Sequence, residues 1–180
     1  MRKLLIITLS VLFVATACTT KTRQYTSPDG TVEAICTYSG SDSTHAQWQF
    51  LTADGKPLVE GCDSVRVLEM GPEGHPMTVC FHKDNQEIWK QFYSTMQLRC
   101  EGVTVNGLRE GLWVYYFPSG NRQTEATFVG GKEEGPYRVY RDNGVPYYIG
   151  QYRGGQRYGI WEVYDPEGNL TGTKEFFNEK

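Results

Sequence analysis

The sequence predicts an all-β protein made of antiparallel β-hairpins that repeat every 24 residues and form an extended meander sheet. Residues 111–120 read GLWVYYFPSG, and residues 159–168 read GIWEVYDPEG. Halfway between them, residues 135–144 read GPYRVYRDNG, with the glycines, the aromatic residue and the tyrosine in the same places. A fixed period without insertions is typical of repeat architectures. The predicted units are residues 106–129, 130–153 and 154–177.

Each unit is predicted to form one hairpin. Its first strand is rich in aromatic and β-branched residues, as in LWVYYF at residues 112–117, and such residues favour strands. Pro118 and Gly120 then occupy the second and fourth places of a type I turn. A second strand follows, as in TEATFV. The glycines at the turns supply positive φ without steric cost.

Residues 82–105 resemble a degenerate fourth unit. Trp89 and Phe92 fall under the aromatic positions, but the glycine positions hold Lys83, Glu87 and Met96. Terminal repeats are often atypical because they cap the array. A helix is the alternative, since Ile88, Phe92 and Met96 follow i, i+4 spacing, but the repeat register favours a strand.

Residues 27–81 are predicted to form an N-terminal β region without a period of its own. Strand-like runs such as TVEAICTY and SVRVLEM alternate with turn sequences such as SPDG and GPEG. This region is expected either to continue the repeat sheet or to pack on its end. Residues 18–26 are predicted to be a short tether.

The N-terminus has the form of an export signal, predicted over residues 1–17. A basic start precedes an apolar run that is shorter than the roughly 20 residues of a transmembrane helix. Ala17 and Cys18 then resemble the lipobox of bacterial lipoproteins, although Ala15 stands where leucine is usual. Lipid on Cys18 would leave four of the five cysteines, an even number that suits an exported chain. We therefore expect a lipoprotein of the cell envelope, anchored in the outer membrane and facing the periplasm.

The four remaining cysteines allow three disulfide pairings, and the sequence does not choose among them. In an oxidising periplasm they predict zero, one or two disulfides. Cys62 and Cys80 are nearly symmetric about the turn at residues 71–74, so they are candidates to face each other across a hairpin. Four reduced, buried thiols are the alternative. The candidates are Cys36, Cys62, Cys80 and Cys100.

The sequence does not predict an enzyme, a cofactor or a metal. Cys80 and His82 share one strand face and His75 is nearby, but no second ligand pair has the spacing of a zinc site. The chain has only three histidines, and it lacks the usual nucleophile-elbow, metalloprotease and phosphate-loop motifs. Removal of Arg2 and Lys3 with the signal changes the net charge from −3 to −5, which gives no reason to expect nucleic acid as a partner.

The two faces of the repeat strands differ in character, because side chains alternate along a strand. Trp113, Tyr137 and Trp161 are predicted to form the buried face. The opposite face is a candidate binding surface for a protein or a glycan. Its candidate partner-binding residues are Tyr116, Arg138, Tyr140, Glu162 and Tyr164. The alternative is that its tyrosines only pack, beneath Phe128, Tyr152 and Phe176.

The recurring pattern G-x-[WY]-x-x-[YF]-x-x-x-G resembles the bacterial variant of the MORN repeat. The resemblance covers residues 106–177 and, weakly, residues 82–105. It implies a hairpin-repeat fold and, through the grouping of such proteins as YwqK-like antitoxins, an antitoxin or immunity protein as one alternative. The prediction favoured by the signal and the repeat is a membrane-anchored lipoprotein that binds a protein partner or acts as a scaffold. A glycan-binding lipoprotein is the second alternative.

Overall fold

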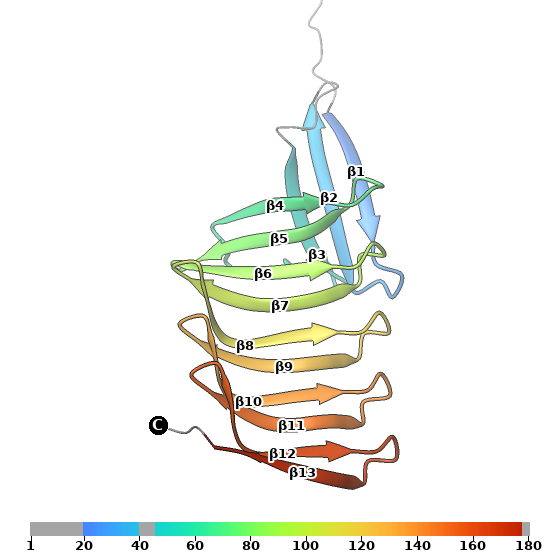
Figure 1. Ribbon diagram of the computed structural model, residues 1–180. Helices are drawn as coiled ribbons and strands as arrows, with labels where there is room; N and C mark the ends of the chain where they lie inside the picture. The colour runs from blue at the N-terminus through green and yellow to red at the C-terminus, as the bar shows by residue number, and fades with distance from the viewer. Residues whose placement is uncertain (1–19, 40–45, 178–180) are drawn as a thin grey trace, which may run out of the picture.

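The computed structural model describes residues 20–39 and 46–177, and the regular structure within these ranges is entirely β-strand. Its strands form two antiparallel sheets (Figure 1). The smaller sheet contains β1 (Thr20–Thr26), β2 (Val32–Ser39) and β3 (Gln47–Thr52). The larger sheet contains β4 (Ser64–Met70), β5 (Pro76–Lys83), β6 (Gln86–Phe92), β7 (Leu98–Val105), β8 (Leu108–Tyr116), β9 (Arg122–Val129), β10 (Lys132–Tyr140), β11 (Pro146–Arg153), β12 (Gln156–Tyr164) and β13 (Leu170–Phe176).

The ten-stranded sheet is a continuous meander whose spatial order follows the chain from β4 at one edge to β13 at the other. This confirms the predicted fold class. The described part of the chain contains no helix that is long and apolar enough to cross a membrane.

The three units correspond to the hairpins β8–β9, β10–β11 and β12–β13. Their turns have the same backbone: Gly120, Gly144 and Gly168 have φ of 89°, 81° and 87°. At the other end of the hairpins, glycine pairs with φ of 55° and 82° and of 59° and 83° form the turns before β10 and β12. The 24-residue period of the sequence is therefore also a period of the backbone.

The degenerate unit 82–105 contains the strands β6 and β7, so the helix alternative is wrong. The hairpin β5–β6 turns at Asp84 and Asn85, which adopt φ of 49° and 61°. In the later units a glycine with positive φ accompanies a register shift in the first strand, whereas the pairing of β5 with β6 has no shift. Glu87 needs no glycine because β6 has no such irregularity. Met96 does keep the left-handed backbone of its glycine counterparts, with φ of 68°.

The N-terminal region is divided between the two sheets. Strands β4 and β5 continue the repeat sheet, while β1–β3 form a second layer at its N-terminal end, with strands that run across those of the long sheet (Figure 1). The layers meet in a hydrophobic core that includes Ala34, Phe50, Val79, Phe81 and Phe92. Both expectations for residues 27–81, continuity and end-packing, thus apply to different strands.

The predicted tether at residues 18–26 is wrong for its described part, because Thr20–Thr26 is strand β1. It pairs with β2 from Thr20 opposite Ser39 to Thr26 opposite Glu33. The alternation TKTRQYT has few apolar residues, but Tyr25 packs against the core and stacks on Trp48 with ring centroids 6.1 Å apart. One aromatic anchor and the backbone pairing with β2 along one edge therefore suffice to order this segment.

The four described cysteines are free thiols: Cys36, Cys62, Cys80 and Cys100. The expectation that Cys62 faces Cys80 is wrong. Val67 pairs with Val79, so the hairpin is centred on residue 73, and the partner of Cys80 on β4 is Arg66. Burial raises the pKa of Cys100 to about 11, so this thiol is protonated at neutral pH and, like other buried cysteines, fills core space.

Candidate functional site

We call the sheet surface that carries Tyr116, Tyr140 and Tyr164 the tyrosine face. A row of side chains crosses this face from strand to strand: Lys90, Glu101, Val114, Glu125, Arg138, Ile149 and Glu162. The N-terminal layer covers the face only over its first strands, where Val67, Val79 and Phe92 join the interlayer core. The remaining strands extend beyond that layer (Figure 1).

Each tyrosine of this face is fixed by a carboxylate. The Tyr116 hydroxyl donates to Glu101 Oε1 at 2.6 Å, and the Tyr140 hydroxyl donates to Glu125 Oε2 at 3.2 Å. Burial raises the pKa of both phenols, and the adjacent carboxylates raise it further. The tyrosines are therefore neutral donors held in one orientation.

Glu125 is the centre of the strongest cluster on this face. Its side chain is 8% exposed, and it accepts from Arg122 Nη1 at 2.5 Å and lies 3.5 Å from Arg138 Nη1. The two arginines are 61% and 43% exposed. A buried charge needs such partners. Here the two arginine side chains pair with the buried Glu125 carboxylate while their guanidinium groups stay accessible to solvent.

The third tyrosine shows how the repeat adapts. Ile149 replaces the acidic residue that the register would place under Tyr164, and Tyr164 instead donates to Glu162 Oε2 on its own strand at 2.7 Å. The structure thus brings Arg138 and Tyr140 together at Glu125, and pairs Glu162 with Tyr164, but it places Tyr116 on a separate acidic partner. Sequence analysis missed Glu125 as a site residue, although its identity with Glu101 at a spacing of 24 was the signal.

The opposite surface, which we call the tryptophan face, carries Trp113, Tyr137 and Trp161. Trp113 and Trp161 are buried and Tyr137 is half-buried. Phe128 packs on Trp113 and Phe176 packs on Trp161, with ring planes at 72° in both pairs. The expectation that Phe128, Tyr152 and Phe176 cover the tyrosine face is therefore wrong, because these rings lie on the tryptophan face.

Arginines complete the burial of these rings. Arg109 lies 4.3 Å from the ring centroid of Trp113, and Arg157 lies 4.6 Å from that of Trp161. The indole nitrogens donate to carbonyl oxygens of the preceding strand, Val103 at 3.1 Å and Gln151 at 3.2 Å. A single sheet can in this way bury aromatic surface without a second layer.

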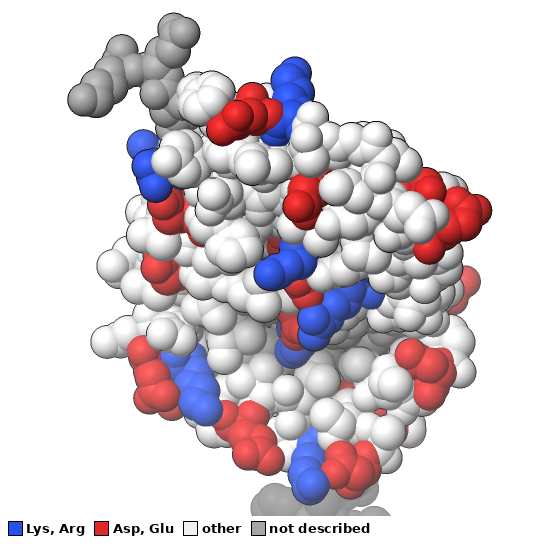
Figure 2. Space-filling model, turned by 90° about the horizontal axis from the view of Figure 1, so that it is seen from below, with Lys and Arg blue, Asp and Glu red and all other residues white. Residues whose placement is uncertain are grey.

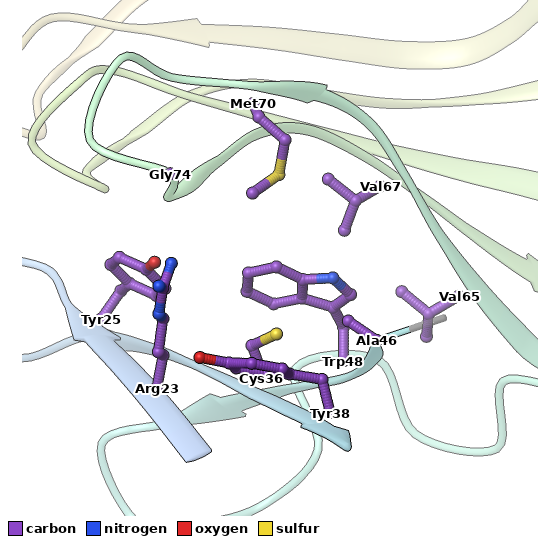
Figure 3. Close-up of a pocket in the computed structure, with 10 residues that line it drawn as sticks. All are labelled: Arg23, Tyr25, Cys36, Tyr38, Ala46, Trp48, Val65, Val67, Met70 and Gly74. Atoms are coloured by element: carbon purple, nitrogen blue, oxygen red, sulfur yellow. The ribbon is translucent and has the colours of Figure 1, made fainter. Parts of the chain in front are cut away.

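A pocket of about 370 Å³ lies between the N-terminal layer and the edge strand β4 (Figure 3). The Trp48 indole occupies its middle, with Met70 and Val67 above it and Tyr38 and Cys36 on the opposite wall. Arg23 stands at one end beside Tyr25. Sequence analysis missed this pocket because it depends on how the two sheets pack.

A cluster that the sequence showed only in part lies at the N-terminal end of the tryptophan face. Cys80, His82 and Glu87 each offer one ligand atom, and these atoms lie within 4.8 Å of one another. The sequence drew attention to Cys80 and His82 together with His75. The structure replaces His75 by Glu87, the cross-strand partner of His82, while His75 is buried in the β4–β5 turn region.

The charges on the end of the molecule at β13 do not mark a further site among the described residues. Viewed from the β13 end, acidic and basic side chains are interspersed and do not form an extended patch of one sign (Figure 2). On this view the surface shows no field that would select a highly charged partner.

The family model for the MORN repeat variant matches residues 109–129 and 157–178. These stretches coincide with β8–β9 and β12–β13, the first and third of the three regular units, and the second unit follows the same backbone between them. Comparison with curated proteins gave no match. The hairpin array of this chain is therefore similar to MORN repeat variants.

Proposed function

We propose that this protein is an envelope lipoprotein whose repeat sheet binds a protein partner through the tyrosine face. The observation that carries the proposal is the cluster at Glu125, where exposed Arg122 and Arg138 stand on a buried carboxylate beside Tyr140. Arginine and tyrosine are the residues most often responsible for affinity at protein interfaces. Side chains that are already fixed also lose less conformational entropy on binding.

The anchoring part of the proposal rests on Cys18, which lies outside the described residues. Support comes from the sequence of the signal and from cysteine parity. Cys18→Ser should move the protein from the detergent phase to the soluble fraction, or leave the signal uncleaved. Wild-type protein that is soluble and carries no acyl mass would refute the anchor while leaving the binding surface untested, so the two parts are measured separately.

The binding part is tested by affinity purification from membranes. The variant Arg138→Glu with Glu162→Arg reverses two charges of the tyrosine face. It should reduce partner recovery at least about tenfold, which corresponds to a loss of roughly 1.4 kcal/mol in binding free energy. A new carboxylate beside Glu125 can itself unfold the sheet, so Arg138→Gln is a second variant that removes the charge without adding repulsion. Circular dichroism establishes that each variant is folded.

The matched control is Lys132→Glu with Glu167→Lys, which makes the same two reversals at exposed ends of hairpins. It should leave partner recovery unchanged. Equal recovery by folded wild-type, tyrosine-face and control proteins would show that the tyrosine face is not the binding surface.

The identity of the recovered protein tests the narrower prediction. The resemblance to YwqK-like antitoxins favours a toxin, for which this chain would be an immunity protein. Co-expression with such a toxin should then rescue growth, and the tyrosine-face variant should fail to rescue it.

A further inference from the structure

We infer that Cys80, His82 and Glu87 bind a zinc ion on the surface of strands β5 and β6. The site lies at the N-terminal end of the tryptophan face, away from the tyrosine face of the repeat units. It does not depend on the proposed partner binding or on the lipid anchor.

The strand geometry brings the three ligands together. Cys80 and His82 are two residues apart on β5, so both project from the same face. Glu87 is the direct cross-strand partner of His82 on β6. Cys80 Sγ lies 3.8 Å from His82 Nε2, and the three ligand atoms fall within 4.8 Å of one another. Ligands of a tetrahedral zinc ion, at about 2.0–2.3 Å from the metal, lie about 3.3–3.8 Å apart, so small side-chain adjustments close the site.

Buried groups already orient the carboxylate. Trp89 Nε1 donates to Thr104 Oγ1 at 2.9 Å, and the Thr104 hydroxyl donates to Glu87 Oε2 at 2.9 Å. Thr104 is itself buried. This chain of hydrogen bonds holds Oε2 and leaves Oε1, which lies 4.0 Å from His82 Nδ1, to face the cation side of the cluster. Hydrogen bonds of this kind fix the ligands of metal sites and tune their affinity.

A cation already lies against these ligands, namely the guanidinium of Arg66. Its Nε donates to His82 Nε2 at 2.9 Å, and its Nη2 donates to Glu87 Oε1 at 3.1 Å. The histidine nitrogen and the carboxylate oxygen therefore present lone pairs to one positive centre. Arg66 is on the edge strand β4 and its side chain is 55% exposed, so it can turn into solvent when a metal replaces it.

The donor set selects the metal. A thiolate, an imidazole and one carboxylate suit zinc, whereas calcium and magnesium prefer oxygen ligands. On binding, the Cys80 thiol gives its proton to solvent as the zinc–sulfur bond forms. His82 and Glu87 also line a surface hollow of about 610 Å³. This hollow lets a water molecule complete four-coordination.

The test is titration of the purified, reduced protein with Zn²⁺ alone, in competition with a chromophoric chelator. Wild-type protein should bind one equivalent. His82→Ala and Glu87→Gln should abolish binding, and because both residues are partly exposed these variants should fold even where Cys80→Ser does not. Arg66→Ala should tighten binding, since it removes the competing cation. Thr104→Val should weaken binding by about tenfold or more through the freed carboxylate.

Two measurements separate this site from adventitious zinc. Cys36→Ser removes a different buried thiol and should bind zinc like the wild type. Co²⁺ bound in place of zinc should show the sulfur-to-metal absorption of a thiolate ligand, and this band should be absent in a folded Cys80→Ser protein. Absence of binding in both wild-type and Arg66→Ala proteins, or binding that persists in His82→Ala and Glu87→Gln, would overturn the inference.

Discussion

Replacement of Gly150 by alanine should destabilise the repeat sheet, because the indole of Trp161 lies directly over this residue. A Cβ at Gly150 would lie 2.3 Å from Trp161 Cδ2, and a Cβ at Gly102 would lie 2.2 Å from Trp113 Cδ2. Both rings are buried, so neither moves aside without opening a gap in its packing. Overpacking of this kind costs about 1–3 kcal/mol.

Elsewhere in the chain an alanine stands in place of the glycine, and a smaller ring packs over it. At the junction of the first and middle units the equivalent positions hold Ala126 and Tyr137, which pack in the same cluster. The double variant Gly150→Ala, Trp161→Tyr copies that pair. Trp161→Tyr alone loses apolar contact and the hydrogen bond to Gln151. The double variant should therefore lose less stability than the two single variants together, by about 0.5–3 kcal/mol.

Urea unfolding followed by far-ultraviolet circular dichroism measures these free energies. Gly172→Ala is the control, because a Cβ there meets no atom within 4 Å, and it should change stability by no more than about 0.5 kcal/mol. Strict additivity of the two single variants, or a Gly150→Ala protein as stable as Gly172→Ala, would refute the assignment of the cost to the indole contact.

Three further predictions concern the backbone and the ion pairs. Met96→Gly should be at least as stable toward urea as Met96→Ala. The backbone of Met96 is left-handed, with φ of 68°, and this conformation costs a residue with a Cβ about 1–2 kcal/mol. A clearly larger loss of stability for the glycine variant would contradict this reasoning. Gly144→Val and Gly168→Val should lower the melting temperature by similar amounts, about 2–8 °C each, and an unchanged melting temperature in either would refute the positional equivalence. Burial opposes ionisation of Glu101, but Lys90 and a tyrosine hydroxyl outweigh it and hold its pKa below the ordinary value. Because the folded pKa is depressed, this stabilisation is present above the unfolded value of about 4.3 and is lost as pH falls through the folded value. Lys90→Met should therefore destabilise the protein most at neutral pH, with a difference that shrinks in acid, and a difference that is constant with pH would contradict the role of this pair.

The repeat region could be predicted from the sequence because its glycines and aromatic residues each have one local cause. The positive φ at position 144 requires a glycine there, and Trp161 fits its position because Gly150 in the preceding strand leaves room for the indole. These constraints recur at a fixed spacing, so the period reveals them together. The strand β6 could be recognised for the same reason, even though it lacks the glycine at Glu87.

The rest depends on contacts between segments that share no pattern. Strand β1 could not be distinguished from a tether, because its order comes from pairing with β2 and from one ring, Tyr25, in the interlayer core. The pocket around Trp48 exists only because two sheets pack together. Glu87 joins Cys80 through cross-strand register, which sequence spacing does not reveal. Cys62 and Cys80 do not face each other because their midpoint, residue 71, lies two residues before the centre of the β4–β5 hairpin at residue 73.

Each aromatic ring of the tryptophan face lies over a small residue 11 positions earlier, so the order of the units matters as well as their period. Excision of residues 106–129 would bring Tyr137 over Gly102, where there is room for it. Excision of residues 130–153 would instead bring Trp161 over Ala126, whose Cβ occupies the space that the indole needs. Units of identical length are therefore not interchangeable. Insertion or deletion of a whole hairpin is therefore compatible with the packing only where the new junction sets each ring over a residue small enough to receive it.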